Sequence, residues 1–360
     1  MQRRNWIKGS MAATGAAVAT AAGWPGLARA QTELNRIGLL LPKSGQAFGR
    51  ASAALRAGVE TAFRRKSAGY AIDIYETDES PKQLTAAYEG MMRRGTSLVI
   101  GPLTRNGTAA LAGFAEVPIT TLALNQFEGD GSVPWNVLVF SIGAEQEALD
   151  VADQAFQRMR KRASAGDKAP KAVIITAANQ IGRRAASVFH AHWLALGGEA
   201  DLPIELEESA LYKFRGVAKK EQGDLYFLSM PPHLARPVRM IIGRDKIVYG
   251  TSQISVGGPG ARQQIRELDG VRLVEMPAII QPNSYGAFGY APPPEDFSLE
   301  MQRLYALGID AMRVGREMFD GASTIDIRGL TGHLRYDGNY PVLERRLVPA
   351  EYKNGVPMAV

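Results

Sequence analysis

The sequence NRIGLLL at residues 35–41 is a short, mainly apolar run that ends at Pro42 and Gly45. Such a run is typical of a strand that is buried on both faces of a parallel sheet. Over residues 47–66 the apolar side chains recur at every third or fourth position, which predicts an amphipathic helix directly after this strand. A buried strand followed by an amphipathic helix is the building unit of α/β folds with parallel sheets.

The same unit repeats along the chain and restarts once, near residue 142. Further strands are predicted at residues 70–75, 97–100, 119–124, 172–176, 202–206, 225–229, 247–249 and 271–274. Amphipathic helices are predicted between them, over residues 105–115, 144–162, 180–196 and 232–242 and after Ser80. Because about 330 residues of such units exceed the usual size of one core, we predict two α/β lobes, each a mostly parallel sheet flanked by helices.

The last part of the chain departs from this pattern. Residues 281–297 are rich in proline, glycine and aromatic residues and predict a long irregular loop, and residues 298–319 predict a strongly striped helix. From residue 327 onward, Asn-Gly and Asp-Gly turns predict a β-meander. We expect residues 31–142 and 277–322 to form the first lobe, and residues 143–276 and 323–360 to form the second.

The first 30 residues have the layout of an export signal. Arg3 and Arg4 precede a mildly apolar stretch, which ends in the small-residue sequence Ala28-Arg29-Ala30. The arginine pair favours a twin-arginine signal, with the mature chain beginning at Gln31. A membrane anchor is the alternative, but the apolar stretch is shorter than the roughly 20 residues that span a bilayer. We therefore expect a soluble periplasmic protein without a stable membrane anchor.

Composition excludes several function classes. Four basic residues of the 30-residue signal account for most of the net charge of +6, so the other 330 residues carry about +2 and predict no nucleic-acid surface. The sequence has no cysteine, and His190 and His192 stand two apart on a predicted helix, where they point to different faces. No phosphate-binding loop or serine-nucleophile motif occurs. We predict no enzyme activity, no metal and no cofactor.

Uncharged polar residues follow several predicted strands at their carboxyl ends, the edge at which open α/β sheets bind ligands. This candidate cleft consists of Ser44, Gln46, Thr104, Asn125, Gln126, Ser252 and Gln253. The alternative is local, because Ser44 and Thr104 also suit helix caps and Asn125 suits a turn. Asp78 and Glu79 form a possible carboxylate pair, but turn residues before a capping serine are the favoured interpretation.

The predicted loop offers a second candidate site. Tyr285, Phe288 and Tyr290 are aromatic side chains of the kind that anchor protein interfaces. Packing of these rings within the protein itself is the alternative.

Seven segments in order resemble one protein family. They are IGLLLPKSGQ (37–46), VIGPLTRN (99–106), VPITTLALNQ (117–126), YGTSQI (249–254), LDGVRLVEMP (268–277), RLYALGIDA (303–311) and GLTGHLRYD (329–337). The chain is thereby identified as similar to the LppC or LpoA family of penicillin-binding protein activators. The resemblance implies a two-lobed fold like that of type I periplasmic solute-binding proteins. It also implies a peptidoglycan synthase as partner.

Two functions remain open at this point. The resemblance favours a non-catalytic regulator of peptidoglycan synthesis that acts by protein contact. The sequence departs from the best-known pattern of that family, since it has no lipid-carrying cysteine and no helical-repeat segment before the first strand. The candidate cleft favours the alternative, a periplasmic solute-binding protein of an ABC transporter for amino acids or similar small solutes.

Overall fold

The computed structural model describes residues 34–43, 45, 48–127, 133–162, 168–220, 222–281 and 283–360. The predicted export signal, residues 1–30, lies outside the described residues, and so do the candidate cleft residues Ser44 and Gln46. Within the described ranges, no helix is both long and apolar enough to cross a membrane.

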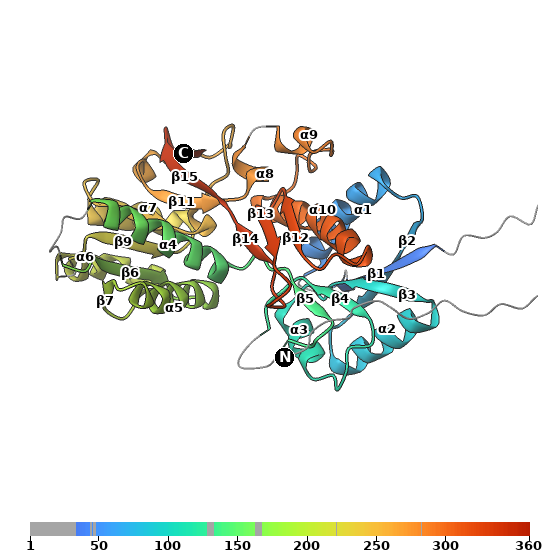
Figure 1. Cartoon of the computed structure of the whole chain (residues 1–360). Coiled ribbons are helices and arrows are strands. Elements are labelled where there is room, and N and C mark those ends of the chain that lie inside the picture. The colour runs from blue at the N-terminus through green and yellow to red at the C-terminus, as the bar shows by residue number, and fades with distance from the viewer. Residues whose placement is uncertain are drawn as a thin grey trace, which may run out of the picture.

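The first lobe is built on a five-stranded, all-parallel sheet with the strand order β2-β1-β3-β4-β5 (Figure 1). Its strands are β1 (Asn35–Pro42), β2 (Tyr70–Thr77), β3 (Thr96–Ile100), β4 (Thr120–Ala123) and β5 (Val137–Val139). Its helices are α1 (Gly49–Arg65), α2 (Pro81–Arg93) and α3 (Arg105–Ala112). The mainly apolar run that opens the sequence analysis forms β1, between β2 and β3 in the sheet.

Helix α10 (Leu299–Phe319) returns to this lobe and packs along α1. The two helices touch at Gly58 and Gly308, where a Cβ atom on either residue would overlap backbone atoms of the other helix. The apolar stripe of α10, including Leu307 and Met312, joins the same buried core as β1. The predicted return of the helix over residues 298–319 to the first lobe therefore agrees with its observed packing.

The second lobe is built on an eight-stranded sheet with helices on both faces. Its main path is β16-β15-β11-β10-β9-β6-β7, and β8 pairs with β6. The parallel strands are β6 (Lys171–Ala177), β7 (Glu199–Ala200), β8 (Ile204–Leu206), β9 (Leu225–Ser229), β10 (Val248–Gly250) and β11 (Arg272–Glu275). Two antiparallel strands complete it, β15 (Val348–Lys353) and β16 (Val356–Ala359).

Helices α4 (Ala144–Arg162) and α5 (Gln180–Ala195) share one apolar core of this lobe. Helix α7 (Pro232–Ile242) belongs to a second core, and α6 (Leu211–Lys220) contributes Phe214 to the same core. Strands β5 and β7 and helix α6 were not predicted, and neither were two short helices, α8 (Pro277–Ile280) and α9 (Ser284–Ala287). The other helices and the other parallel strands lie within a few residues of their predicted positions.

The tail of the chain is divided between the two lobes. Strands β12 (Ile325–Arg328), β13 (His333–Tyr336) and β14 (Glu344–Arg346) form a small antiparallel sheet. The buried apolar side chains of β12 and β13, Leu334 among them, belong to the core of the first lobe. Only β15 and β16 join the second sheet, so residues 325–346 differ from the expected placement in the second lobe. The reason is long-range packing, since the apolar face of this sheet is buried against the first-lobe core.

Candidate functional site

The two lobes meet through charged side chains that no local sequence pattern singles out. Two of the contacts are buried ion pairs, Glu147–Arg345 and Glu275–Arg303, which we call the hinge pairs. A third contact is a more accessible group of Arg105, Glu145 and Arg184, which we call the cleft clasp.

The first hinge pair joins α4 to the small sheet. Arg345 of β14 donates from Nη2 to Oε1 of Glu147 at 3.2 Å and from Nη1 to the Thr331 carbonyl at 3.2 Å. The side chains of Arg345 and Glu147 are only 0% and 2% exposed. Burial raises the pKa of the Glu147 carboxyl, and the facing Arg345 guanidinium acts in the opposite direction. Water therefore cannot replace either partner if the other side chain is removed.

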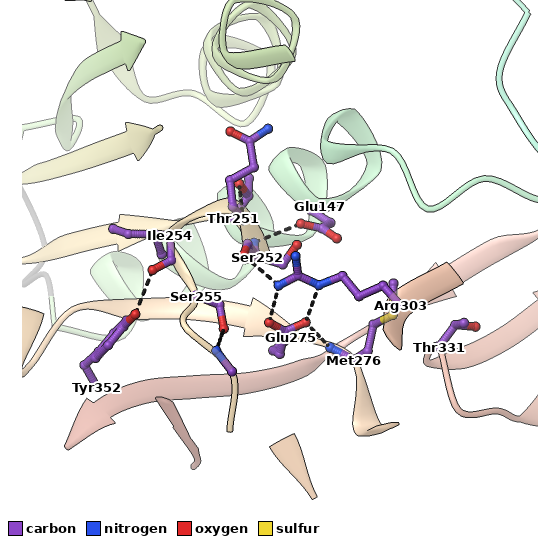
Figure 2. Close-up of polar contacts among 12 residues, drawn as sticks. Glu147, Thr251, Ser252, Ile254, Ser255, Glu275, Met276, Arg303, Thr331 and Tyr352 are labelled. Atoms are coloured by element: carbon purple, nitrogen blue, oxygen red, sulfur yellow. Dashed lines mark hydrogen bonds and ion pairs between the residues drawn. The ribbon is translucent and has the colours of Figure 1, made fainter. Parts of the chain in front are cut away.

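The second hinge pair joins the end of β11 to α10 (Figure 2). Arg303 Nη2 lies 2.6 Å from Oε2 of Glu275, a carboxylate with no exposed surface, and it also donates to the Ser252 carbonyl at 2.9 Å. The Ser252 N–H donates to Oε2 of Glu147 at 2.9 Å. The backbone of Ser252 therefore connects the two hinge pairs into one network.

The cleft clasp joins the lobes at a different place, near the beginnings of α3 and α5, which Figure 1 shows on the same lower side of the molecule. Arg105 is the first residue of α3 and contacts Oε1 of Glu145 on α4. Arg184 of α5 contacts the same oxygen with its Nε at 2.9 Å. One carboxylate of the second lobe is thus held by one arginine from each lobe.

The predicted cleft residues of the first lobe lie beside the clasp, and their polar atoms contact the chain itself. Thr104 caps α3, accepting from the Gly107 N–H at 3.2 Å, and its hydroxyl donates to the Glu79 carboxylate. Asn125 donates to the Leu103 carbonyl at 3.0 Å and accepts from the N–H of Gln126 at 2.9 Å. Thr104 is therefore observed as a helix cap and Asn125 as a turn residue, which is the local alternative to a ligand site.

Glu79, which the sequence pattern predicts to be a turn residue, lies against Thr104 at the start of α3. It is 5% exposed and has a φ of 58°, in the left-handed region. Burial raises the pKa of its carboxyl, although the hydrogen bonds from Thr104 act in the opposite direction. Asp78, in contrast, is exposed and accepts from the Ser80 N–H at 2.9 Å, as a turn residue does.

The predicted cleft residues of the second lobe belong to the hinge network. Ser252 is 6% exposed, and its backbone is engaged on both sides by Glu147 and Arg303. Gln253 is half-buried, and its N–H donates to the Thr251 hydroxyl at 3.4 Å. The structure therefore places these two residues beside the hinge pairs, whereas Thr104, Asn125 and Gln126 lie together beside the clasp.

The aromatic candidate surface is largely packed within the protein. Tyr285 is 8% exposed, and its ring lies 5.8 Å from that of Tyr305 on α10, so it is a core residue and not an exposed anchor. The reason is that residues 284–287 form a short helix, α9 (Ser284–Ala287), which turns this ring inward. Phe288 and Tyr290 are half-buried, and each is covered by an arginine guanidinium at 5.1 Å from the ring centre.

Two surface cavities lie on the second lobe. One, of about 480 Å³, is lined by Arg236, Arg244 and residues 263–267, and the other, of about 300 Å³, lies between α4 and strands β10, β11 and β15. Neither is lined by a hinge pair or clasp residue. Among the described residues, no group of three or more histidine and acidic side chains is placed to hold a metal ion.

The family described as "LppC putative lipoprotein" matches residues 15–210 and 217–355. A penicillin-binding protein activator LpoA from Haemophilus ducreyi is 26% identical over 348 residues, which cover 90% of this chain and 54% of that protein. The chain thus spans about half the length of the curated relatives that it matches.

Two solved structures share the fold. The LpoA C-domain from Haemophilus influenzae, a regulator of PBP1A, has a TM-score of 0.70 at 18% identity and covers 91% of this chain and 100% of that chain. A "putative branched-chain amino acid ABC transporter" from Chromobacterium violaceum has a TM-score of 0.70 at 28% identity, with 88% and 99% covered. The predicted two-lobed, periplasmic-binding-protein-like fold is confirmed.

Proposed function

Because the chain belongs to the LppC family, we propose that it is a non-catalytic regulator that acts on a peptidoglycan synthase of the bacterial envelope by protein contact. The curated relatives bear the name of penicillin-binding protein activators. The region of LpoA that this chain resembles in fold is a domain whose own structure is described as that of a regulator of PBP1A. The twin-arginine signal and release of a soluble form into the periplasm are parts of the same proposal.

The observation that carries the proposal is the match of the family over nearly the whole chain. The state of the candidate cleft supports it. The hydroxyl of Thr104, the amide of Asn125 and the backbone of Ser252 make their hydrogen bonds to groups of the chain itself. A regulator that presents a fixed outer surface has no need of these groups for a solute.

The direct test adds the purified chain to a bifunctional peptidoglycan synthase and measures cross-linking of a lipid-linked precursor. We expect the rate of cross-linking to rise with the concentration of the chain and to saturate, together with a complex detected by co-purification. An unchanged rate without any complex would overturn the proposal.

A single substitution in the aromatic candidate surface makes the same test at one residue. Tyr290 is the candidate anchor chosen for this test, since its ring lies beneath Arg65 and packs against the first-lobe core while remaining only half-buried. If it is an anchor, Tyr290→Ser should weaken the complex by more than about 1 kcal/mol. Tyr340→Ser is the matched control, because Tyr340 is 75% exposed on a different segment and should leave the affinity unchanged.

A second candidate function is solute binding for an ABC transporter. It is favoured by the 28% identity to the Chromobacterium violaceum protein, which exceeds the identity to the LpoA relatives. The discriminating measurement is the melting temperature with and without amino acids. A rise of several degrees, with no effect on a synthase, would favour the receptor.

A further inference from the structure

The cleft clasp has the composition of an anion-binding site. Two guanidinium groups, from Arg105 and Arg184, converge on the single oxygen Oε1 of Glu145. Arg105 Nη2 donates a hydrogen bond to this oxygen, a strong type of bond because both partners are charged. Arg184 Nε lies 2.9 Å from the same oxygen as an ion pair, without hydrogen-bond geometry. Glu145 is 11% exposed and the arginines are 21% and 27% exposed, so the site is shielded but open to solvent.

The site also lies at the edge of both sheets where α/β proteins place their ligands. Arg105 begins α3, which follows the carboxyl end of β3, and Arg184 lies in α5, which follows the carboxyl end of β6. The carboxylate, in contrast, comes from the first turn of α4, a helix of the second lobe. Two arginines near the carboxyl edges of the two sheets, where α/β proteins bind ligands, are thus joined by the Glu145 carboxylate of the chain itself.

We propose that Arg105 and Arg184 form a binding site for the carboxylate group of a small organic acid, and that Glu145 fills this site as a tethered ligand. This inference goes beyond regulation of a synthase and does not depend on it. The ligand class follows from the group that occupies the site, a carboxylate on a short aliphatic stem. The consequence is that the two lobes are bridged here without any bound solute.

Competition explains how the tether would act. A group attached by a short flexible link has an effective concentration of the order of millimolar or above, so a free acid must exceed that level to displace it. Displacement requires only the end of the Glu145 side chain to move. Its Oε2 lies close to Gly143, and a Cβ atom on that residue would come within 2.8 Å of the oxygen. The unmodified chain should therefore respond poorly to dilute carboxylates.

The test removes the tethered ligand and supplies a free one. Glu145→Ala deletes a group of the size of acetate and leaves both arginines in place. We expect acetate at about 50 mM to raise the melting temperature of this variant by about 1 to 2 °C, and that of the unmodified chain much less. Acetamide has nearly the same shape but no charge and should have no effect at equal ionic strength.

Three controls make the result specific. Glu351→Ala removes a carboxylate that is 24% exposed and is paired with Arg272 at 3.1 Å, and should gain no response to acetate. Adding Arg105→Ala to Glu145→Ala should abolish the response. Glu145→Gly deletes one more carbon and should prefer propionate, which keeps the inference testable if the alanine variant folds poorly.

Two results would overturn the inference. One is an equal response to acetate in the Glu145→Ala variant and in the unmodified chain. The other is a response to acetamide as large as that to acetate, since binding would then not depend on the two charges.

Discussion

The hinge pairs and the cleft clasp connect the same two lobes with the same kinds of side chain but in different surroundings. Arg345 and Glu147 are 0% and 2% exposed, and in the second hinge pair Glu275 has no exposed surface while Arg303 is 13% exposed. The three clasp side chains are 11% to 27% exposed. In the hinge pairs, a carboxylate that loses its partner stays out of water. In the clasp, water or a solute can take the partner's place.

A count of ion pairs therefore does not reveal which contacts hold the lobes together and which can exchange their partner for water or a solute. Buried pairs are costly to form and more costly to break on one side only, while partly exposed pairs contribute little to stability. We therefore assign the fixed connection between the lobes to the hinge pairs and the exchangeable one to the clasp.

The largest effect is expected from breaking a hinge pair on one side. Arg345→Met leaves the Glu147 carboxylate buried without its cation, and a loss of about 3 to 5 kcal/mol in the free energy of unfolding is expected. Denaturant unfolding followed by circular dichroism measures it. In Glu147→Gln/Arg345→Met the amide oxygen can still accept from the Ser252 N–H and no charge remains, so most of the loss should be recovered. A loss under about 1 kcal/mol in the single variant would contradict the assignment.

Local pattern was sufficient for most of the fold. The helix predicted at residues 298–319 is observed as Leu299–Phe319, and the strand predicted at 225–229 is observed as Leu225–Ser229. Strand β5 has only three residues and was missed, because so short a run has no period of its own. The division of the tail between two lobes was also missed, because it depends on packing between distant segments.

The candidate site was harder to predict. The strand-end rule led to Thr104 and Ser252, which do lie beside the clasp and the hinge pairs, but their hydrogen bonds are made within the chain. Arg105 and Arg184 lie on predicted helices, where a charged side chain is normally explained by exposure to solvent. Only the fold brings them to one carboxylate. The one signal available was their position near the beginnings of helices that follow strand ends.

Glu79 gives an intermediate case, since it is buried as the hinge pairs are but contacts Thr104, which lies beside the clasp. Burial raises its pKa in the folded chain, so the folded state holds the proton more tightly than the unfolded state does. Its contribution to stability is complete below the unfolded pKa and is lost as the pH rises through the folded pKa.

Glu79→Gln should remove this dependence while it keeps an oxygen that can accept from Thr104. We expect the stability of the variant, relative to the unmodified chain, to increase as the pH rises above the ordinary range of a glutamate. Urea unfolding at a series of pH values measures it. A difference between the two chains that does not vary with pH would show that Glu79 titrates as an ordinary exposed carboxyl.

The smallest effect on stability is expected from the clasp. Arg105→Ala breaks the contact between the lobes at this point and leaves Arg184 beside Glu145. Because the pair is partly exposed, the free energy of unfolding should fall by no more than about 1 kcal/mol. A loss as large as that of Arg345→Met would mean that the clasp is a second hinge.

The distance between the lobes tests most directly whether the clasp can open while the hinge pairs hold. The sequence has no cysteine, so Met92→Cys on α2 and Leu194→Cys on α5 introduce two labelling sites at positions that are 48% and 44% exposed. Double electron–electron resonance between spin labels at these sites should give one narrow distance distribution for the otherwise unmodified chain. Adding Glu145→Ala should broaden the distribution and lengthen its mean, and acetate should reverse the change. An identical distribution with and without Glu145 would contradict the account.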